Sequence, residues 1–222
     1  MQSFTEENYL KAIYILSSSE NQSVSTNAIA EKLSTKASSV TDMLKKLAEK
    51  KLIRYEKYQG AELTGKGKKI AINIIRKHRL WEVFLVNHLN FKWDEVHDIA
   101  EELEHINSEK LIEHLDRFLN FPQFDPHGDP IPDKDGKIYH HKEVSVKDLK
   151  VGESGIIVGV KEHHPDFLRY LENTDLLLGT HIKVLKVFEW DNSVKLKCDK
   201  KQEITISEKV AGNLYIKKVL NK

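Results

Sequence analysis

Apolar positions near the N-terminus recur every three to four residues, which is the spacing of amphipathic helices. This period covers residues 5–17, where Ser3 and Glu6 predict a capping box at the helix start. Two more helical periods, 26–33 and 38–50, lie on either side of a short polar turn. The pattern therefore predicts a single helix followed by a helix–turn–helix pair.

The pattern changes to a hairpin directly after the third predicted helix. Residues 52–64 contain two short strand-like runs around Gln59 and Gly60, a pair that is typical of a tight turn. A helix, a helix–turn–helix and then a hairpin is the order of a winged helix–turn–helix. We therefore expect a winged helix–turn–helix at the N-terminus.

A second helical section follows this hairpin. The period predicts a long helix over about 66–90 and another within 93–106, and Ser108 predicts the cap of a further helix that runs through Leu119. Four of the five prolines fall in residues 121–136, so this stretch is predicted to be a linker.

Beyond the linker the apolar positions alternate, which is the period of β-strands. The strand-like runs are ESGIIVGV, THIKVLKVFEW, VKLKC, EITI and LYIKKV, with a turn at Asp191 and Asn192 and a short helix over 165–174. They predict a small β-barrel of about five strands. The expected fold class is mainly α with a small β domain, and the expected domains cover residues 1–65, 66–140 and 141–222.

Composition places the chain among ordinary globular proteins. Its 222 residues are 40% hydrophobic and 31% charged, which is enough to bury a real core. Cys198 is the only cysteine, so an internal disulfide and a cysteine-rich zinc site are both excluded. The sequence has neither a signal-peptide pattern nor an apolar run of membrane-spanning length. We expect a cytoplasmic protein with no membrane partner.

Charge is distributed unevenly along the chain. Residues 1–80 hold 15 lysines and arginines against eight acids, whereas residues 81–143 hold six against 15. The remaining segment, 144–222, is mildly basic. A basic first segment suits a polyanion and an acidic middle suits cations, although charges also solvate helices without any ligand.

The predicted second helix of the helix–turn–helix has the chemistry of a DNA-reading helix. Small and hydroxyl side chains at its start allow close approach to base edges, and the lysines that follow are placed to meet phosphates. The alternative is a trihelical core with a lysine-rich soluble surface. The hairpin and the basic charge favour double-stranded DNA as the partner. The predicted contacts are Ala37, Ser38, Ser39, Thr41, Asp42, Lys45 and Lys46, with Lys57 on the wing.

The stretch HDIAEELEH, residues 97–105, collects imidazoles and carboxylates on one side of a helix. His97, Glu101, Glu104 and His105 share that side, whereas Ile99 and Leu103 lie opposite. In the preceding helix His78 and Glu82 lie at i and i+4, and therefore also on one face. Oxygen-rich ligands with imidazole and without sulfur suit Mn(II) or Fe(II).

Two other interpretations of this acidic face remain open. An acidic helix face is usually just solvated by water. Glu102 and His105 also form a Glu-x-x-His element like that of di-iron carboxylate bundles, which would make the protein a metalloenzyme, but that fold needs a second copy of the motif and the chain offers one good copy. Nothing in the chain resembles a catalytic nucleophile, a phosphate loop or a cofactor fingerprint. We therefore expect no enzyme and no small organic substrate.

Taken together, the basic winged segment and the motifs RKHRLWEVFL, VHDIAEELEHI and GDPIP resemble the diphtheria toxin repressor family of metal-dependent transcriptional repressors, including its manganese-sensing branch. The segments SVKDLKVGESGIIVGV and LLLGTHIKVLKV resemble the C-terminal SH3-like (FeoA-like) barrel of the longer members. The resemblance implies a homodimer formed by the middle helices. It further implies a repressor that binds a palindromic operator when metal is bound and controls metal-uptake genes.

The resemblance also implies a regulatory metal site made of Asn8, Glu101, Glu104 and His105. Asn8 stands where family members place an aspartate or methionine, so it brings an oxygen without charge. Glu101 stands where iron-sensing members place a cysteine, which favours Mn(II) with Fe(II) as the alternative. Lys11 stands where one manganese-sensing subgroup has a glutamate, which argues against that subgroup's closely spaced pair of ions.

A second metal site is implied by the same resemblance, and its ligands form overlapping sets. His78, Glu82 and His97 match the iron-sensing members, whereas Asp125 and His127 match linker ligands of some manganese-responsive relatives. The barrel places His163, His164 and Asp166 where it reaches a metal in the family. Sequence leaves open how these residues are divided, and surface roles remain an alternative for His163 and His164.

Overall fold

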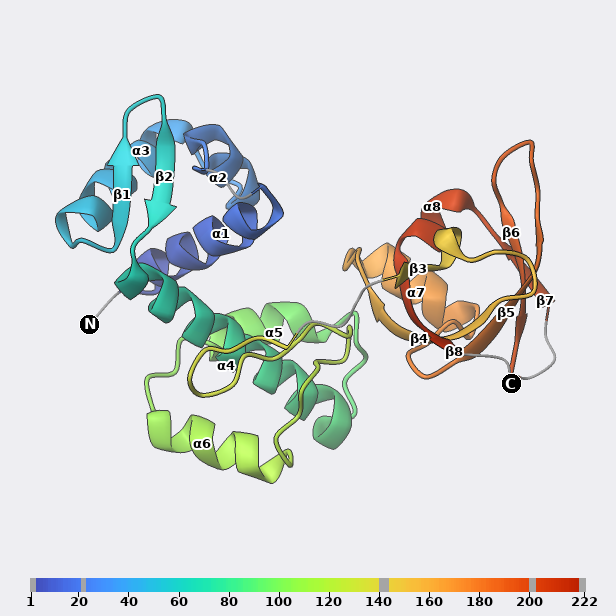
Figure 1. Cartoon of the computed structure of the whole chain (residues 1–222). Helices are drawn as coiled ribbons and strands as arrows, with labels where there is room; N and C mark the ends of the chain where they lie inside the picture. The colour runs from blue at the N-terminus through green and yellow to red at the C-terminus, as the bar shows by residue number, and fades with distance from the viewer. Residues whose placement is uncertain (1–2, 21–22, 140–143, 200–202, 220–222) are drawn as a thin grey trace.

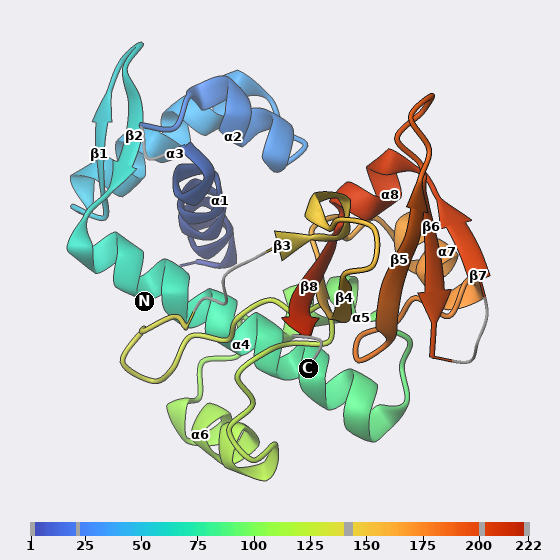
Figure 2. The same ribbon diagram turned by 45° about the vertical axis from the view of Figure 1, so that its right-hand side comes forward.

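The computed structural model describes residues 3–20, 23–139, 144–199 and 203–219. We call residues 3–63 the head, 64–139 the middle unit and 144–219 the sheet domain. The head and the sheet domain lie on opposite sides, and the helices of the middle unit lie between them (Figures 1 and 2). The predicted class, mainly α with a small β domain, is confirmed.

The head is a winged helix–turn–helix, as the pattern predicts. Both bonds of the predicted capping box form between Ser3 and Glu6, each at 3.3 Å, and Ser25 caps the second helix by accepting from the amide of Ala28. An isolated bridge between Val24 and Ala61 joins the wing to the turn before that helix. The elements are α1 (Phe4–Glu20), α2 (Thr26–Lys32), α3 (Ala37–Glu49), β1 (Ile53–Glu56) and β2 (Gly60–Leu63).

The middle unit begins with one unbroken helix of 25 residues that runs out of the wing. Thr64 caps its start, and Asn90, in the left-handed conformation, ends it. Ser108 caps the last helix of the unit, as expected. The elements are α4 (Gly65–Leu89), α5 (Val96–Leu103) and α6 (Glu109–Phe118).

The buried face of α5 differs from the one that the periodicity predicts. Ile99 and Leu103 are only half-buried, whereas Val96, Ala100 and the carboxylate of Glu104 are buried. The helix ends at Leu103, and its acidic side is only partly covered: Glu104 is buried, Glu101 is half-buried and His97 is exposed. The buried carboxylate of Glu104 is contacted by the ammonium of Lys11 at 2.6 Å.

The proline-rich stretch is not a free linker. Its residues Asp125, His127 and Ile131 are buried against the middle unit, and Arg79 of α4 holds it by donating to Asp129 at 3.1 Å and to the carbonyl of Pro130. Proline content predicted a break in regular structure correctly. The packing comes from buried side chains that composition does not reveal.

The sheet domain contains six antiparallel strands in the order β3-β8-β4-β5-β6-β7. No pairing joins the end strands β3 and β7 among the described residues, so the small barrel predicted with about five strands has six and is not closed. The pattern missed only the shortest pieces, β3, η1 and α8. The elements are β3 (Val144–Ser145), η1 (Val146–Asp148), β4 (Ser154–Val160), α7 (Pro165–Asn173), β5 (His181–Val187), β6 (Val194–Cys198), β7 (Glu203–Ile206), α8 (Glu208–Gly212) and β8 (Leu214–Val219).

The sheet domain docks on the middle unit through the proline-rich stretch. The amide of Val160 donates to the carbonyl of His127 at 2.9 Å. Gly128 follows with φ of +90°, and a Cβ at that position would lie 2.2 Å from the carbonyl oxygen of Val158. Trp93, which follows α4, joins the apolar cluster of the sheet domain. These contacts place the sheet domain next to the buried side chains of Asp125 and His127 in the proline-rich stretch. Within the part of the chain that the structure describes, no helix is both long and apolar enough to cross a bilayer.

Candidate metal centre

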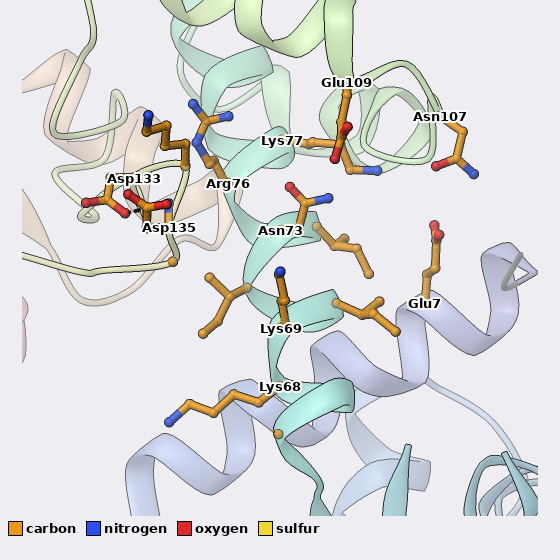
Figure 3. Close-up of a pocket in the computed structure, with 16 residues that line it drawn as sticks. Glu7, Lys68, Lys69, Asn73, Arg76, Lys77, Asn107, Glu109, Asp133 and Asp135 are labelled. Atoms are coloured by element: carbon orange, nitrogen blue, oxygen red, sulfur yellow. Dashed lines mark hydrogen bonds between the residues drawn. The ribbon is translucent and has the colours of Figure 1, made fainter. Parts of the chain in front are cut away.

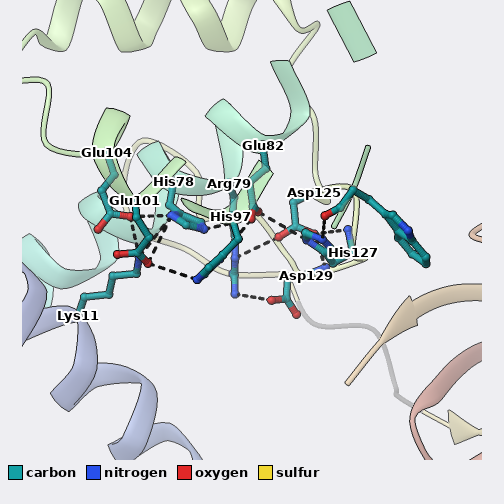
Figure 4. A network of polar contacts seen from close by, with 11 residues as sticks. Lys11, His78, Arg79, Glu82, His97, Glu101, Glu104, Asp125, His127 and Asp129 are labelled. Carbon is teal, nitrogen blue, oxygen red and sulfur yellow. Dashed lines mark hydrogen bonds and ion pairs between the residues drawn. The ribbon is translucent and has the colours of Figure 1, made fainter. Parts of the chain in front are cut away.

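Two groups of three side chains each gather their metal-ligating atoms within 4.8 Å of one another among the described residues. The first group is His78, His97 and Glu101, and the second is Glu82, Asp125 and His127. Helix α4 supplies one member to each group, α5 supplies two to the first, and the proline-rich stretch supplies two to the second. Figure 4 shows both groups as parts of one polar network along α4.

The first group is centred on His78. Its Nδ1 lies 2.7 Å from Glu104 Oε2 and its Nε2 lies 3.1 Å from Glu82 Oε1. Burial acts to lower the pKa of His78, but Glu104 and Glu82 outweigh it and raise that pKa. His97 is more exposed, and its ring nitrogens lie 3.8 Å from Glu82 and 3.7 Å from Glu101. The carboxylates around His78 therefore favour its protonated form, and the ring of His97 lies near two of the same acids.

The second group is fully buried. His127 Nε2 lies 2.8 Å from the carbonyl oxygen of Trp93, which makes Nε2 the donor and directs Nδ1 towards Glu82 at 3.8 Å. Burial and the charge of Glu82 raise the pKa of Asp125 to about 7. Burial lowers the pKa of His127, but Glu82 and Asp125 bring it to about 9. Two buried carboxylates side by side favour a bound cation.

Arg79 supports the second group, and sequence reasoning did not single it out. Its Nε lies 3.5 Å from Asp125 Oδ2, and the amides of His127 and Asp129 donate to Asp125 Oδ1 at 2.8 and 2.9 Å. These bonds fix the loop and orient the carboxylate. The signal was present in the KHRLWE motif, where Arg79 lies between His78 and Glu82.

The predicted regulatory residues lie at the junction of the head and the middle unit. Asn8 Oδ1 and Glu104 Oε1 are buried acceptors without a hydrogen-bond partner among the described residues. His105 Nε2 lies 3.9 Å from that Glu104 oxygen. Buried acceptors of this kind are costly unless something binds them. The donor set, amide and carboxylate oxygen with imidazole nitrogen, fits a divalent cation.

Two residues of α1 that sequence reasoning did not propose as ligands complete this junction. Glu7 Oε2 lies 2.6 Å from His105 Nδ1, which leaves Nε2 free to face Glu104. The ammonium of Lys11 binds Glu101 at 2.5 Å and Glu104 at 2.6 Å. It also holds the pKa of Glu101 below its usual value, against the burial that would raise it. Glu101 and Glu104 are therefore already partnered by an ammonium.

The sheet-domain residues divide between the centre and the surface. The ring of His163 stacks on that of His127 with centroids 4.9 Å apart, so it borders the second group. Burial lowers the pKa of His163. Asp166 and His164 are exposed at the start of α7, where Asp166 pairs with Arg169 at 2.6 Å and His164 caps the helix. The structure thus brings His163 to the second group but not Asp166 or His164.

A cavity of about 590 Å³ borders the regulatory residues on the other side of α1 (Figure 3). It lies between α1, α4, the start of α6 and residues 133–136. Its lining mixes acids such as Glu7 and Glu109 with lysines such as Lys77. Glu7 lines this cavity and also contacts His105, so the cavity lies beside the junction.

The predicted DNA-contacting residues form the outer face of the head. Ala37, Ser38 and Ser39 are exposed at the start of α3, as are Asp42, Lys45 and Lys46, whereas Thr41 is half-buried. The side chains of Thr41, Asp42, Lys45 and Lys46 have hydrogen-bond or ion-pair partners within the protein. Thr41 donates to the carbonyl of Ala37 at 3.0 Å, Lys45 lies 3.6 Å from Asp42, and Lys46 lies 3.0 Å from Glu6. Lys57 is exposed on the wing, with its ammonium 4.9 Å from the ring centre of Tyr58.

Comparisons with known proteins agree with this arrangement. Residues 1–61 match the model of the iron dependent repressor N-terminal DNA binding domain, 64–133 its metal binding and dimerisation domain, and 144–218 the FeoA domain. The chain is 38% identical over 128 residues to the iron-dependent repressor IdeR of Mycobacterium tuberculosis, an alignment that covers 58% of this chain and 55% of that relative. It thus spans just over half the length of the mycobacterial relatives.

Two further relatives are covered more completely. The transcriptional regulator MntR of Oceanobacillus iheyensis is 36% identical over 115 residues, which are 52% of this chain and 77% of that protein. A manganese-dependent transcriptional repressor solved with manganese is 32% identical, with a TM-score of 0.84 over 96% of this chain and 100% of the other. This chain belongs to the family of metal-dependent transcriptional repressors.

Proposed function

We propose that this protein is a metal-activated, DNA-binding repressor of metal-uptake genes, with Mn(II) as the activating ion and Fe(II) as the alternative. The observation that carries the proposal is the junction between head and middle unit. There α1 of the head presents the unpartnered Asn8 oxygen, and the middle unit presents the unpartnered oxygen of Glu104. A cation that binds both joins the DNA-binding head to the rest of the molecule.

The regulatory site in this proposal uses Asn8, Glu101, Glu104 and His105. A divalent ion bound there supplies positive charge to buried oxygens. Glu7 orients the imidazole of His105 through its 2.6 Å contact, and the short turn after α5 keeps Glu104 and His105 side by side. Sulfur is absent from this set, and oxygen ligands with one imidazole favour Mn(II) over softer metals. Iron(II) remains the alternative because it accepts the same donors.

The second site in this proposal uses Glu82, Asp125 and His127, with His163 beside them. His78 and His97 of the first group lie 3.1 and 3.8 Å from Glu82, so Glu82 links the two groups. Arg79 and the amides of the proline-rich stretch hold Asp125 in place. Because this stretch also docks the sheet domain, occupation of the second site would brace that domain against α4.

Coupling between metal and DNA follows from linkage. If the orientation of the head that binds the ion is also the orientation that binds DNA, bound metal strengthens DNA binding. Bound DNA then strengthens metal binding by the same factor. The exposed start of α3 reads base edges while Lys45 and Lys57 contact phosphates. We propose a homodimer on a palindromic operator, because two related heads match two half-sites. A protein with this role works in the cytoplasm beside the DNA.

The proposal is tested by measuring binding to operator-like DNA with Mn(II), with anaerobic Fe(II) and with chelator. We expect tight binding with metal and weak binding with chelator. Equal binding in all three conditions would identify a metal-independent DNA-binding protein instead. A variant with both Glu104→Ala and His105→Ala should keep its fold by circular dichroism and lose the metal response; a full response would refute the site.

The role of Lys45 has its own measurement. Replacing it by alanine removes one phosphate contact, so binding should weaken on every DNA sequence and the slope of log affinity against log salt should fall by about one unit. Lys32, which is exposed at the end of α2, is the matched control and should change the slope less. Loss of preference for one base, with an unchanged salt slope, would assign Lys45 to base reading.

A further inference from the structure

Lys11 is a buried lysine of α1 whose ammonium has three close partners. Its Nζ lies 2.5 Å from Glu101 Oε1, 2.6 Å from Glu104 Oε2 and 3.3 Å from His78 Nδ1. An ammonium has three protons to donate, and here it donates to the carboxylates of Glu101 and Glu104 while the ring of His78 lies beside it. Lys11 is 8% exposed, and Glu104 is fully buried. Lys11 therefore occupies a built cation position and is not a surface lysine at the edge of an acidic patch.

All three partners belong to the middle unit, whereas Lys11 belongs to the head. Glu101 lies on α5, Glu104 caps its end, and His78 lies on α4. In Figure 4 Lys11 reaches from α1 to the two carboxylates. One side chain thus joins two structural units, and it uses carboxylates that the proposed function assigns to a metal ion.

We propose that Lys11 is a built-in latch that holds the head on the middle unit when no divalent ion is bound. This proposal rests on the proposed function only in naming Glu101 and Glu104 as metal ligands; the contact itself needs no metal. An ion at Asn8, Glu101, Glu104 and His105 then reinforces a head position that Lys11 already maintains. Lys11 acts as a positioning residue, through the carboxylates that it holds.

The expected effect of removing the ammonium is specific. Glu101 and Glu104 would lose their cation, and a buried carboxylate without a partner is strongly disfavoured. The head has its own apolar cluster, which includes Leu10, Ile13 and Leu44, so it keeps its internal fold. The contact between α1 and α5 should weaken while α3 stays unchanged.

Hydrogen exchange followed by mass spectrometry tests the latch in the full-length protein. In metal-free solution with chelator, we expect the amides of α5 to exchange at least tenfold faster in Lys11→Met than in the natural chain. Lys11→Arg should restore slow exchange, because it keeps a cation at the same place. Lys50→Met is the matched control: it removes a lysine bound to Glu6 within the head, and α5 should be unaffected. Unchanged exchange of α5 in Lys11→Met overturns the latch.

Adding Mn(II) tests the latch and the proposed metal site independently of each other. In Lys11→Met, Mn(II) should slow the exchange of α5 again, because the ion replaces the missing charge. If metal-free Lys11→Met exchanges fast and Mn(II) has no effect, the latch stands and the metal site at Glu101 and Glu104 is wrong. If Lys11→Met does not fold, Lys11→Gln provides the same comparison with a neutral polar side chain.

Discussion

Glu6 is a fully buried carboxylate that links α1 to α3 inside the head. Lys50 lies 2.7 Å from its Oε1 and Lys46 lies 3.0 Å from the same oxygen. Burial by itself would raise the pKa of Glu6, but these lysines and the amide of Ser3 bring it down to about 2. The folded head therefore stabilises the ionised form of Glu6.

A pH-dependent loss of stability follows from this shift. The pKa of Glu6 falls from 4.5 to about 2 on folding, so the stabilisation is complete above pH 4.5 and is lost as the pH falls towards 2. We expect Glu6→Gln to lower the free energy of unfolding by about 1–2 kcal/mol at neutral pH, a figure reduced because both lysines are partly exposed. Urea unfolding of the metal-free protein at pH 6 and pH 3 measures it. A deficit equally large at both pH values would contradict the assignment.

At the scale of single residues, local pairs were predictable and distant ones were not. His78 and Glu82 share a helix face by spacing alone, and their side chains meet at 3.1 Å. The contact between His105 and Glu7 spans 98 residues, and no local pattern indicates which acid will meet that imidazole. The contacts of Lys11 at the junction could not be predicted for the same reason, because its carboxylate partners lie about 90 residues away in the sequence.

Among the elements, the first turn of α4 packs closely against the chain just before β1 and so determines where the wing lies. Gly67 lies in this turn, where a Cβ would lie 2.0 Å from the carbonyl oxygen of Leu52, just before β1. Gly65 is two residues earlier in the same helix and has open space around it. The long helices were predictable because their period persists over many turns. The strand β3, with two residues, and the helix α8, with five, are too short for any period to be read.

Alanine substitutions at these two glycines should have opposite effects. Gly67→Ala forces the wing away from α4, and we expect it to lower the free energy of unfolding by about 2 kcal/mol or more. Gly65→Ala adds helix propensity without a clash and should raise it by up to about 1 kcal/mol. Thermal and urea unfolding compare the two variants directly. If both variants are stabilised, the close approach of Leu52 to Gly67 is wrong.

In the whole molecule, the proline-rich stretch determines where the sheet domain sits. Gly128 lies against the backbone of β4 in a left-handed conformation that suits glycine. Composition predicted a linker here, because prolines mark breaks but give no information on packing. The open sheet was also unpredictable, since alternation reveals which residues face inward but not whether the end strands meet.

Substitution of Gly128 should release the sheet domain. Gly128→Ala places a Cβ 2.2 Å from the carbonyl oxygen of Val158, so the docked position becomes unavailable. Gly152→Ala is the matched control, because it has the same φ of +90° with nothing within 4 Å. We expect calorimetry to show a separate transition for the sheet domain only in Gly128→Ala. Identical melting of both variants would mean that the conformational cost alone matters.

An exposed apolar face on the middle unit gives the expected dimer a physical basis. Phe118 is 61% exposed at the end of α6, two turns after the 40% exposed Leu111, and its ring lies 4.7 Å from that of His88 of α4. We expect Phe118→Glu to produce monomers in light scattering after size exclusion and to weaken operator binding. Lys110→Glu, a charge change of similar kind at another exposed position of α6, is the control. A dimer that survives Phe118→Glu would move the interface elsewhere.

The unbroken course of α4 has a mechanical consequence. Helix α4 starts at the wing, and His78 and Glu82 lie in its second half, roughly 20–25 Å from that start. A tilt of about 5° at these residues would displace the outer end by roughly 2 Å, so the helix acts as a lever arm. In a two-fold dimer two such levers would move in opposite directions. Ångström-scale adjustments around His78 and Glu82 would then change the separation of the two recognition helices by several ångströms, without any bending of the protein between them.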